Sequence, residues 1–223
     1  MRKDRAVVLC SGGLNSAVLA AMARDSAEVT LLHATGPHPA AQRESDAVDR
    51  IAAHYSLAPV VRADLAFVSR IAELAAPPND PDAAPPADGP APSLAPLLLA
   101  AGEQLARAIG ATRLWWGHCP RRAADAGKPD ADTEPREFVQ LVEHALAMTG
   151  RPRPLVVEAP FVDLSGGEVV KLARRLEVPM KLTWSCHFGG ETPCGDCAGC
   201  RRRAAFFMQA TIVDPGMVRA AVS

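Results

Sequence analysis

The stretch from Ala6 to Arg24 most narrowly constrains what this chain can fold into. Ala6 to Cys10 is a short apolar run, typical of a strand buried on both faces of a sheet. Ser11-Gly12-Gly13 follows as a turn, and Ser16 to Arg24 has the alanine, leucine and methionine content of a helix. This order of elements favours an α/β domain with parallel strands.

The same turn has the features of an anion site. Glycines let the backbone approach a phosphate closely, and the free N–H groups at the start of a helix point at it. The turn has neither the Gly-Lys-Ser/Thr of a Walker loop nor the glycine spacing of a dinucleotide fingerprint. We expect a phosphate site here, with a tight turn that binds nothing as the alternative. The residues of this expected site are Leu9, Cys10, Ser11, Gly12, Gly13, Leu14, Asn15 and Ser16.

Strands and helices alternate along most of the chain, which implies parallel pairing with right-handed crossovers. Ser165 and Glu168 have the spacing of a capping box, and Gly110 is placed to end a helix. The expected strands after the first are 28–33, 58–61, 114–117 and 155–158, and the expected helices after the first are 42–55, 97–109, 136–148 and 165–176.

Residues 76–96 differ in kind because they hold eight prolines in twenty-one positions. Proline lacks a backbone donor and fixes φ, so we expect a surface excursion or lid here, not a helix or an inner strand. The α/β alternation resumes afterwards. We therefore assign residues 1–180 to one α/β domain and residues 181–223 to a C-terminal segment packed on it.

Composition excludes several classes of protein. The net charge is −1 and the pI is about 6.6, so nucleic acid is not expected as the main partner. No apolar run approaches the roughly 18–20 residues that cross a bilayer, and no signal peptide precedes the first strand. We expect a cytoplasmic protein without a membrane partner.

Four of the six cysteines lie close together near the C-terminus, at Cys186, Cys194, Cys197 and Cys200. In a chain without an export signal, this clustering indicates a metal site and not a disulfide framework. Four thiolates complete a tetrahedral zinc site, which leaves a structural role and no open position. An iron–sulfur cluster is the alternative, but the cysteine and proline that typically follow such a triplet are absent.

Arg201-Arg202-Arg203 follows directly after the last cysteine. These side chains either offset the charge of the metal site or bind phosphate, and the sequence does not decide between the two. RNA binding through this segment rests on the same three residues alone.

With these motifs in view, the chain resembles the 7-cyano-7-deazaguanine synthase (QueC) family of the N-type ATP pyrophosphatase, or PP-loop, group. Three stretches carry the resemblance, in the family's order. The loop from Ser11 to Ser16 is similar to Ser-Gly-Gly-x-Asp-Ser, Arg136-Glu137-Phe138 with Ala145-Leu146 is similar to a helix of the family, and residues 182–206 are similar to its zinc-binding segment. The implied fold is a parallel-sheet, Rossmann-like domain of the adenine nucleotide α-hydrolase kind.

The resemblance also implies a reaction. Members use ATP with Mg²⁺ to adenylate 7-carboxy-7-deazaguanine, and ammonia then gives an amide that a second activation converts to the nitrile. By this resemblance Asn15, Ser16 and Lys171 are the expected catalytic residues. The alternatives are transfer of the activated deazaguanine to another amine, and a nucleotide-binding pseudoenzyme. A homodimer is also an expectation.

The chain departs from the family's pattern at four places. Asn15 stands where the family has Asp, and Thr35-Gly36-Pro37 replaces Tyr-Gly-Gln. The segment 92–96 lacks the arginine of Pro-Gly-Arg-Asn, and 165–168 lacks the lysine of Ser-Lys-x-Glu. Lys171, about one helical turn further on, is the expected substitute for that lysine.

Overall fold

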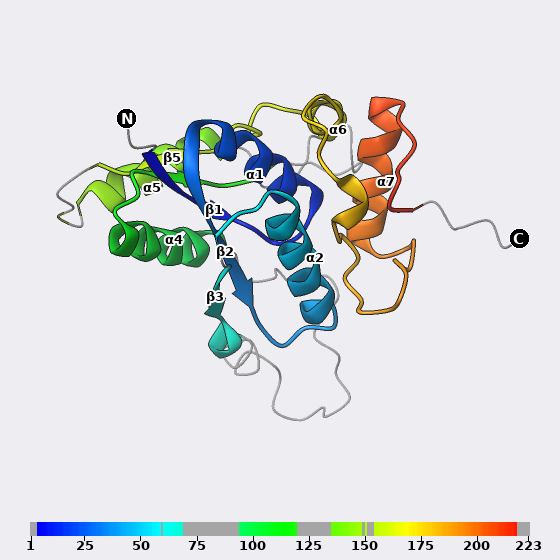
Figure 1. Ribbon diagram of the computed structural model, residues 1–223, viewed down its shortest axis with the longest axis horizontal. Helices are drawn as coiled ribbons and strands as arrows, with labels where there is room; N and C mark the ends of the chain where they lie inside the picture. The colour runs from blue at the N-terminus through cyan, green and yellow to red at the C-terminus, as the bar shows by residue number, and fades with distance from the viewer. Residues whose placement is uncertain are drawn as a thin grey trace, which may run out of the picture.

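Five parallel strands form one sheet in the computed structural model of this protein (Figure 1). The strands are β1 (Asp4–Leu9), β2 (Ala27–Thr35), β3 (Val61–Asp64), β4 (Arg113–Trp115) and β5 (Val156–Glu158), in the order β3-β2-β1-β4-β5. This arrangement confirms the expected α/β class. The structure describes residues 4–58, 60–68, 94–119, 135–148, 150 and 154–217.

Helices cover both faces of the sheet. The helices on one face are α1 (Leu14–Ser26), α2 (Ala41–His54), α6 (Gly166–Arg175) and α7 (Ala198–Ala210), and those on the other are α4 (Ala95–Ile109) and α5 (Pro135–Ala147). The central strand β1 serves both layers, because Ala6 and Val8 face the first and Val7 and Leu9 face the second. All four side chains are at most 8% exposed, so an uninterrupted apolar run is what this position requires.

Three elements differ from the sequence expectations. The third strand was expected at 58–61 but spans Val61–Asp64; it is an edge strand whose side chains are largely exposed, so it carries little apolar signal. Helix α4 begins at Ala95, inside the proline-rich stretch, because Pro96 lies in its first turn, where a missing N–H costs nothing. The rest of that stretch, and residues 120–134 of the expected polar loop, lie outside the described residues. Helix α7 was not predicted at all.

Two glycines at the start of α6 allow close packing against α7. Helix α6 starts with the predicted capping box, in which Ser165 and Glu168 bond reciprocally. A Cβ at Gly166 would lie 1.9 Å from the Phe206 ring, and a Cβ at Gly167 would lie 2.7 Å from Gln209. A lysine at position 166 would therefore displace Phe206, which packs α7 into the core.

A buried ion pair fastens the C-terminal segment. The Arg203 guanidinium lies 2.6 Å from Asp214, and the two side chains are only 5% and 8% exposed. The same guanidinium donates to the Met180 carbonyl and to the Thr183 hydroxyl. Arg203 thus joins α7 to the 3₁₀ turn η2 (Met180–Leu182) and to the chain beyond α7.

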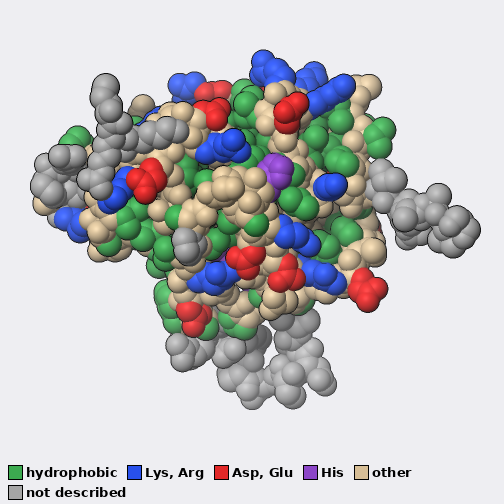
Figure 2. All heavy atoms as spheres, in the orientation of Figure 1, with side chains coloured by type: hydrophobic (Ala, Val, Ile, Leu, Met, Phe, Trp, Pro, Cys, Tyr) green, Lys and Arg blue, Asp and Glu red, His purple; other side chains and the backbone are tan. Residues whose placement is uncertain are grey.

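The surface carries charges of both signs. Figure 2 shows lysine and arginine side chains interspersed with aspartate and glutamate side chains on the face that it draws. Among the described residues, no helix is both long and apolar enough to cross a membrane.

Replacing Arg203 should destabilise the protein strongly. Arg203→Met leaves the Asp214 carboxylate buried without its partner, which typically costs about 3–5 kcal/mol of the free energy of unfolding. The matched control is Arg201→Met, since Arg201 pairs with Asp196 at the exposed surface and such a pair contributes about 1 kcal/mol or less. Urea unfolding followed by circular dichroism measures both changes; equal losses would contradict the assigned role of Arg203.

Candidate nucleotide and metal site

The candidate site lies where the strand order changes direction. Strands β2 and β3 extend from one side of β1, and β4 and β5 extend from the other. In parallel sheets, the crevice at the carboxyl ends of two such strands is where ligands bind. Here it is formed by the loop Ser11–Gly13 after β1 and by residues 116–119 after β4. The Asn15 side-chain amide donates to the Gly117 carbonyl at 3.1 Å and ties the two together.

Helix α1 presents an uncapped N-terminus to this crevice. It begins after Gly13, whose N–H donates to the Ser11 hydroxyl oxygen at 3.4 Å, and it has no side-chain cap. Its first turn holds no acidic residue, and the Ser16 hydroxyl donates to the Gly13 carbonyl at 3.0 Å instead of accepting from the backbone. The free N–H groups and the positive end of the helix dipole therefore remain available to an anion.

Gly12 is required by its surroundings as well as by its conformation. Its φ is +80°, in the left-handed region, and a Cβ there would lie 2.7 Å from the Glu44 carbonyl oxygen of α2. Its own carbonyl accepts a 2.9 Å hydrogen bond from the Trp184 N–H. The loop is thus held between α2 and the C-terminal segment.

The predicted site residues differ in whether their side chains are buried or accessible to a ligand. Leu9, Cys10 and Leu14 are buried in the core, and burial raises the pKa of the Cys10 thiol, so these three contribute backbone alone. Ser11 is exposed on the loop, and Ser16 lies beneath it.

Two other predicted roles have different outcomes. Asn15 is where this chain departs from the Asp of the family. Its side-chain amide donates to the Gly117 carbonyl, and a carboxylate has no hydrogen with which to make that bond. Lys171 is exposed on α6, and its role stays a prediction.

Two titratable residues beside the loop were missed by the sequence analysis. His33, at the end of β2, is 2% exposed, and its Nδ1 lies 2.9 Å from the Cys10 carbonyl. Burial lowers its pKa, which keeps the ring neutral at pH 7. Glu44 lies on the buried stripe of α2, and burial raises its pKa to about 7. The sequence offered a signal for Glu44, because a carboxyl on the apolar stripe of an amphipathic helix is unusual. It offered none for His33, which stands within an apolar run.

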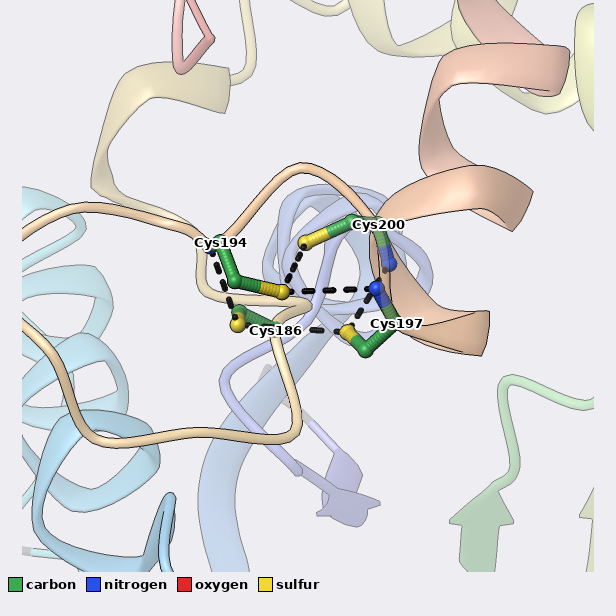
Figure 3. A group of neighbouring side chains, drawn as sticks. All are labelled: Cys186, Cys194, Cys197 and Cys200. Carbon is green, nitrogen blue, oxygen red and sulfur yellow. Dashed lines mark hydrogen bonds between the residues drawn. The ribbon is translucent and has the colours of Figure 1, made fainter.

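The four predicted cysteines converge on one point (Figure 3). All four sulfur atoms lie within 4.8 Å of one another, and the Cys194–Cys200 and Cys186–Cys197 pairs are each 3.9 Å apart. Four sulfurs bound tetrahedrally at about 2.3 Å from one ion would lie roughly 3.8 Å apart. The cysteines are free thiols. The cluster therefore fits a single metal ion.

Backbone N–H groups prepare these sulfurs for a cation. Burial raises the pKa of the Cys197 thiol, but the N–H groups of His187 and Cys200 that point at its sulfur outweigh burial and lower the pKa to about 6. Cys197 also caps α7. For Cys200, burial raises the pKa to about 12, so this thiol needs a metal ion to displace its proton.

The three arginines after the cluster have separate partners. Arg203 is buried against Asp214, Arg202 donates to the Cys119 carbonyl, and Arg201 pairs with Asp196. They do not form one phosphate-binding group, because each guanidinium is directed at a different element. Arg202 links the start of α7 to the segment after β4.

The cysteine-bearing segment, residues 184–200, contacts the loop Ser11–Gly13 through Trp184. This residue lies two positions before Cys186, is 8% exposed, and packs with Ala40 and Ala47 against α2. The Arg43 guanidinium lies 5.6 Å from the centre of its ring. The order of the cysteine-bearing segment is thereby coupled to the position of the Gly12 peptide.

The amino-acid sequence matches one protein family over most of its length. Residues 5–211 match the family described as "Queuosine biosynthesis protein QueC". The 7-cyano-7-deazaguanine synthase of Methanothrix thermoacetophila is 34% identical over 221 residues, which are 95% of this chain and 97% of that protein. The one from Parasynechococcus marenigrum is 33% identical over 223 residues, 94% of this chain and 95% of its own length.

The fluorescence of Trp184 should report on a metal ion bound by the four cysteines. A chelator should shift the tryptophan emission to longer wavelength, because Trp184 loses the anchor two residues away and becomes hydrated. The Tm should fall by about 4–8 °C, the shift that a loss of ~2 kcal/mol produces in a domain of this size. The control is Trp184→Phe, which keeps Trp115 and Trp116 and should show no emission shift. Unchanged emission from the native chain after complete metal loss would contradict the coupling.

Proposed function

The chain belongs to the QueC family of queuosine biosynthesis proteins, and we propose on that basis that it is an ATP-dependent 7-cyano-7-deazaguanine synthase. Its substrates are 7-carboxy-7-deazaguanine, ATP and ammonia, and its product is the nitrile. The observation that carries the proposal is the uncapped N-terminus of α1 at the point where the strand order changes. An anion with several oxygens is the ligand that satisfies it.

The residues of the loop supply positioning and charge stabilisation. The backbone at Ser11, Gly12 and Gly13 and the first turn of α1 hold the phosphates of ATP. As the substrate carboxylate attacks the α-phosphorus, negative charge develops on the leaving pyrophosphate, and the same N–H groups stabilise it. Mg²⁺ accompanies ATP, with the phosphate oxygens as its main ligands, because Asn15 offers no charge.

The first test is pyrophosphate release. The native chain should release pyrophosphate from MgATP only when 7-carboxy-7-deazaguanine is present. Ammonia should convert the adenylate to the amide, and a second ATP-dependent activation should dehydrate the amide to the nitrile. Release of pyrophosphate without amide from ammonia would point to another amine as acceptor. ATP binding without any pyrophosphate release would overturn the synthase and leave a non-catalytic nucleotide-binding protein.

A matched pair of variants at Ser11 locates the reaction on the loop. Ser11→Asp places a negative charge beside the expected phosphates, whereas Ser11→Asn has nearly the same shape without the charge. We expect Ser11→Asp to weaken ATP binding at least tenfold more than Ser11→Asn does. Equal ATP affinities, measured by calorimetry, would place the phosphates elsewhere.

We propose that the four-cysteine cluster holds one structural zinc ion. The sulfur separations support a single ion, because cysteines around a cluster of several irons are held further apart. Four thiolates leave zinc no open position for substrate, so its role is to order the segment around Trp184. Free thiols also suit a reducing compartment, and we place the protein in the cytoplasm. A homodimer stays a prediction.

Elemental analysis of protein purified without added metal tests this assignment. We expect one zinc per chain, and less than half of it in a Cys194→Ser variant, because Cys194 is an exposed ligand that the fold tolerates losing better than a buried one. Iron with a visible absorption band, or no metal at all, would overturn the zinc assignment.

A further inference from the structure

Glu44 is an acidic residue beside the loop Ser11–Gly13, and the phosphate contacts proposed above do not involve its side chain. It lies on the face of α2 that also carries Ala40, Ala47 and Val48, all buried in the protein. Helical side chains tilt toward the N-terminus of their helix. Because α2 follows a parallel strand, its N-terminus is at the carboxyl edge of the sheet, and the Glu44 carboxyl extends toward that edge, where it lies 3.6 Å from His38 in the loop after β2.

Backbone contacts place this turn of α2 directly against the phosphate loop. The Glu44 carbonyl oxygen would lie 2.7 Å from a Cβ at Gly12, which means that only a glycine fits between the loop and this turn. The distance between the helix and the loop is thereby set by the backbone of the same residue whose side chain extends toward the carboxyl edge of the sheet.

The carboxyl lacks a strong cationic partner in the described part of the chain. His38 Nε2 lies 3.6 Å from Glu44 Oε2, and the Glu44 side chain is 27% exposed. Arg43, on the same turn, is directed at Gly189 and the Trp184 ring, and His33 is bonded to the Cys10 carbonyl. Cys186 and Cys200 pack with Ala40 and Ala47, which flank Glu44 on this face of α2. Burial without compensation raises the pKa of Glu44 to about 7.

We propose that Glu44 accepts the proton of the amine that attacks the acyl adenylate, an inference that rests on the proposed function. In the crevice, an ammonium ion is the cation that the carboxylate would pair with. Its N–H bond breaks, the proton moves to Glu44, and the freed lone pair attacks the carbonyl carbon. The C–O bond to AMP then breaks, AMP leaves with the electron pair, and the second proton passes to solvent.

A proton acceptor is useful here because ammonia is largely protonated at neutral pH and then has no lone pair for attack. A group whose pKa lies near the working pH is the best compromise between holding and taking a proton, and proton transfer of this kind typically contributes roughly 10²–10⁴-fold in rate. An exposed glutamate would be too weak a base for this step.

The test separates adenylation from amide formation. In Glu44→Gln, ATP–pyrophosphate exchange with 7-carboxy-7-deazaguanine should stay within about threefold of native, while amide formation from ammonia at pH 7 should fall by roughly 10²–10⁴-fold. Hydroxylamine, which is already neutral at pH 7, should restore the rate. Glu44→Asp should keep part of the ammonia-dependent rate. The matched control is Asp46→Asn on the same helix, whose carboxylate accepts from Gln42 at the exposed surface.

A stability measurement shows independently that the variant is folded and that the carboxyl is buried. The pKa of Glu44 is raised above its ordinary value of 4.5, so its contribution to stability is present at low pH and is lost as the pH rises through about 7. Glu44→Gln should therefore become more stable relative to the native chain between pH 5 and pH 8.

Each other outcome overturns something specific. A native amide rate in Glu44→Gln overturns the role of Glu44 and leaves the proposed function standing. If Glu44→Gln loses both exchange and amide formation and needs more Mg²⁺, the role of Glu44 as a proton acceptor is overturned, and Glu44 is a ligand of Mg²⁺ instead. A native chain that gives no exchange with 7-carboxy-7-deazaguanine overturns the proposed function itself, and this proposal with it.

Discussion

The close approach of backbone at Gly12 is the constraint on which the site depends. Three parts of the chain meet there without an intervening side chain: the loop after β1, the first turn of α2, and the segment that precedes the cysteines. Contact through backbone atoms permits little adjustment, since neither partner can change rotamer to relieve a clash. The N–H groups of the loop and of α1 are therefore aimed by the packing of elements that are far apart in sequence.

The C-terminal segment contributes to the site through order and not through chemistry. Residues between η2 and α7 have few apolar side chains, and two devices hold them in place: the four sulfurs on one side and the buried Arg203–Asp214 pair on the other. Trp184 lies between the two devices and bonds to the loop. A metal ion held by the four cysteines would in this way help to fix the position of the loop.

The electrostatics of the crevice follow from which groups are satisfied and which are not. Helix α6 is fully capped by Ser165 and Glu168, whereas α1 has no side-chain cap at all. Burial lowers the pKa of His33, so the ring offers no positive charge to an anion in the crevice. Burial raises the pKa of Glu44 to about 7, and its ionic partner in the described part of the chain is His38, at 3.6 Å, so the charge of Glu44 depends on what occupies the crevice.

The sequence by itself determined the elements whose signals are local. The apolar run before Ser11, the capping box at Ser165, the end of α4 at Gly110 and the spacing of the four cysteines each depend on neighbours along the chain, and the structure confirms all four. The family could be recognised for the same reason, because its motifs are short and contiguous.

Only the tertiary structure decided what the departures and the unassigned residues do. A side chain at position 166 would overlap Phe206 of α7, and Asn15 bonds to a carbonyl on a different strand's loop, 102 residues away. Arg203 forms a buried ion pair because its partner, Asp214, lies beyond the end of α7. Glu44 acquires its raised pKa from the core around it. These properties arise from burial and from contacts between distant segments, which a linear pattern does not contain.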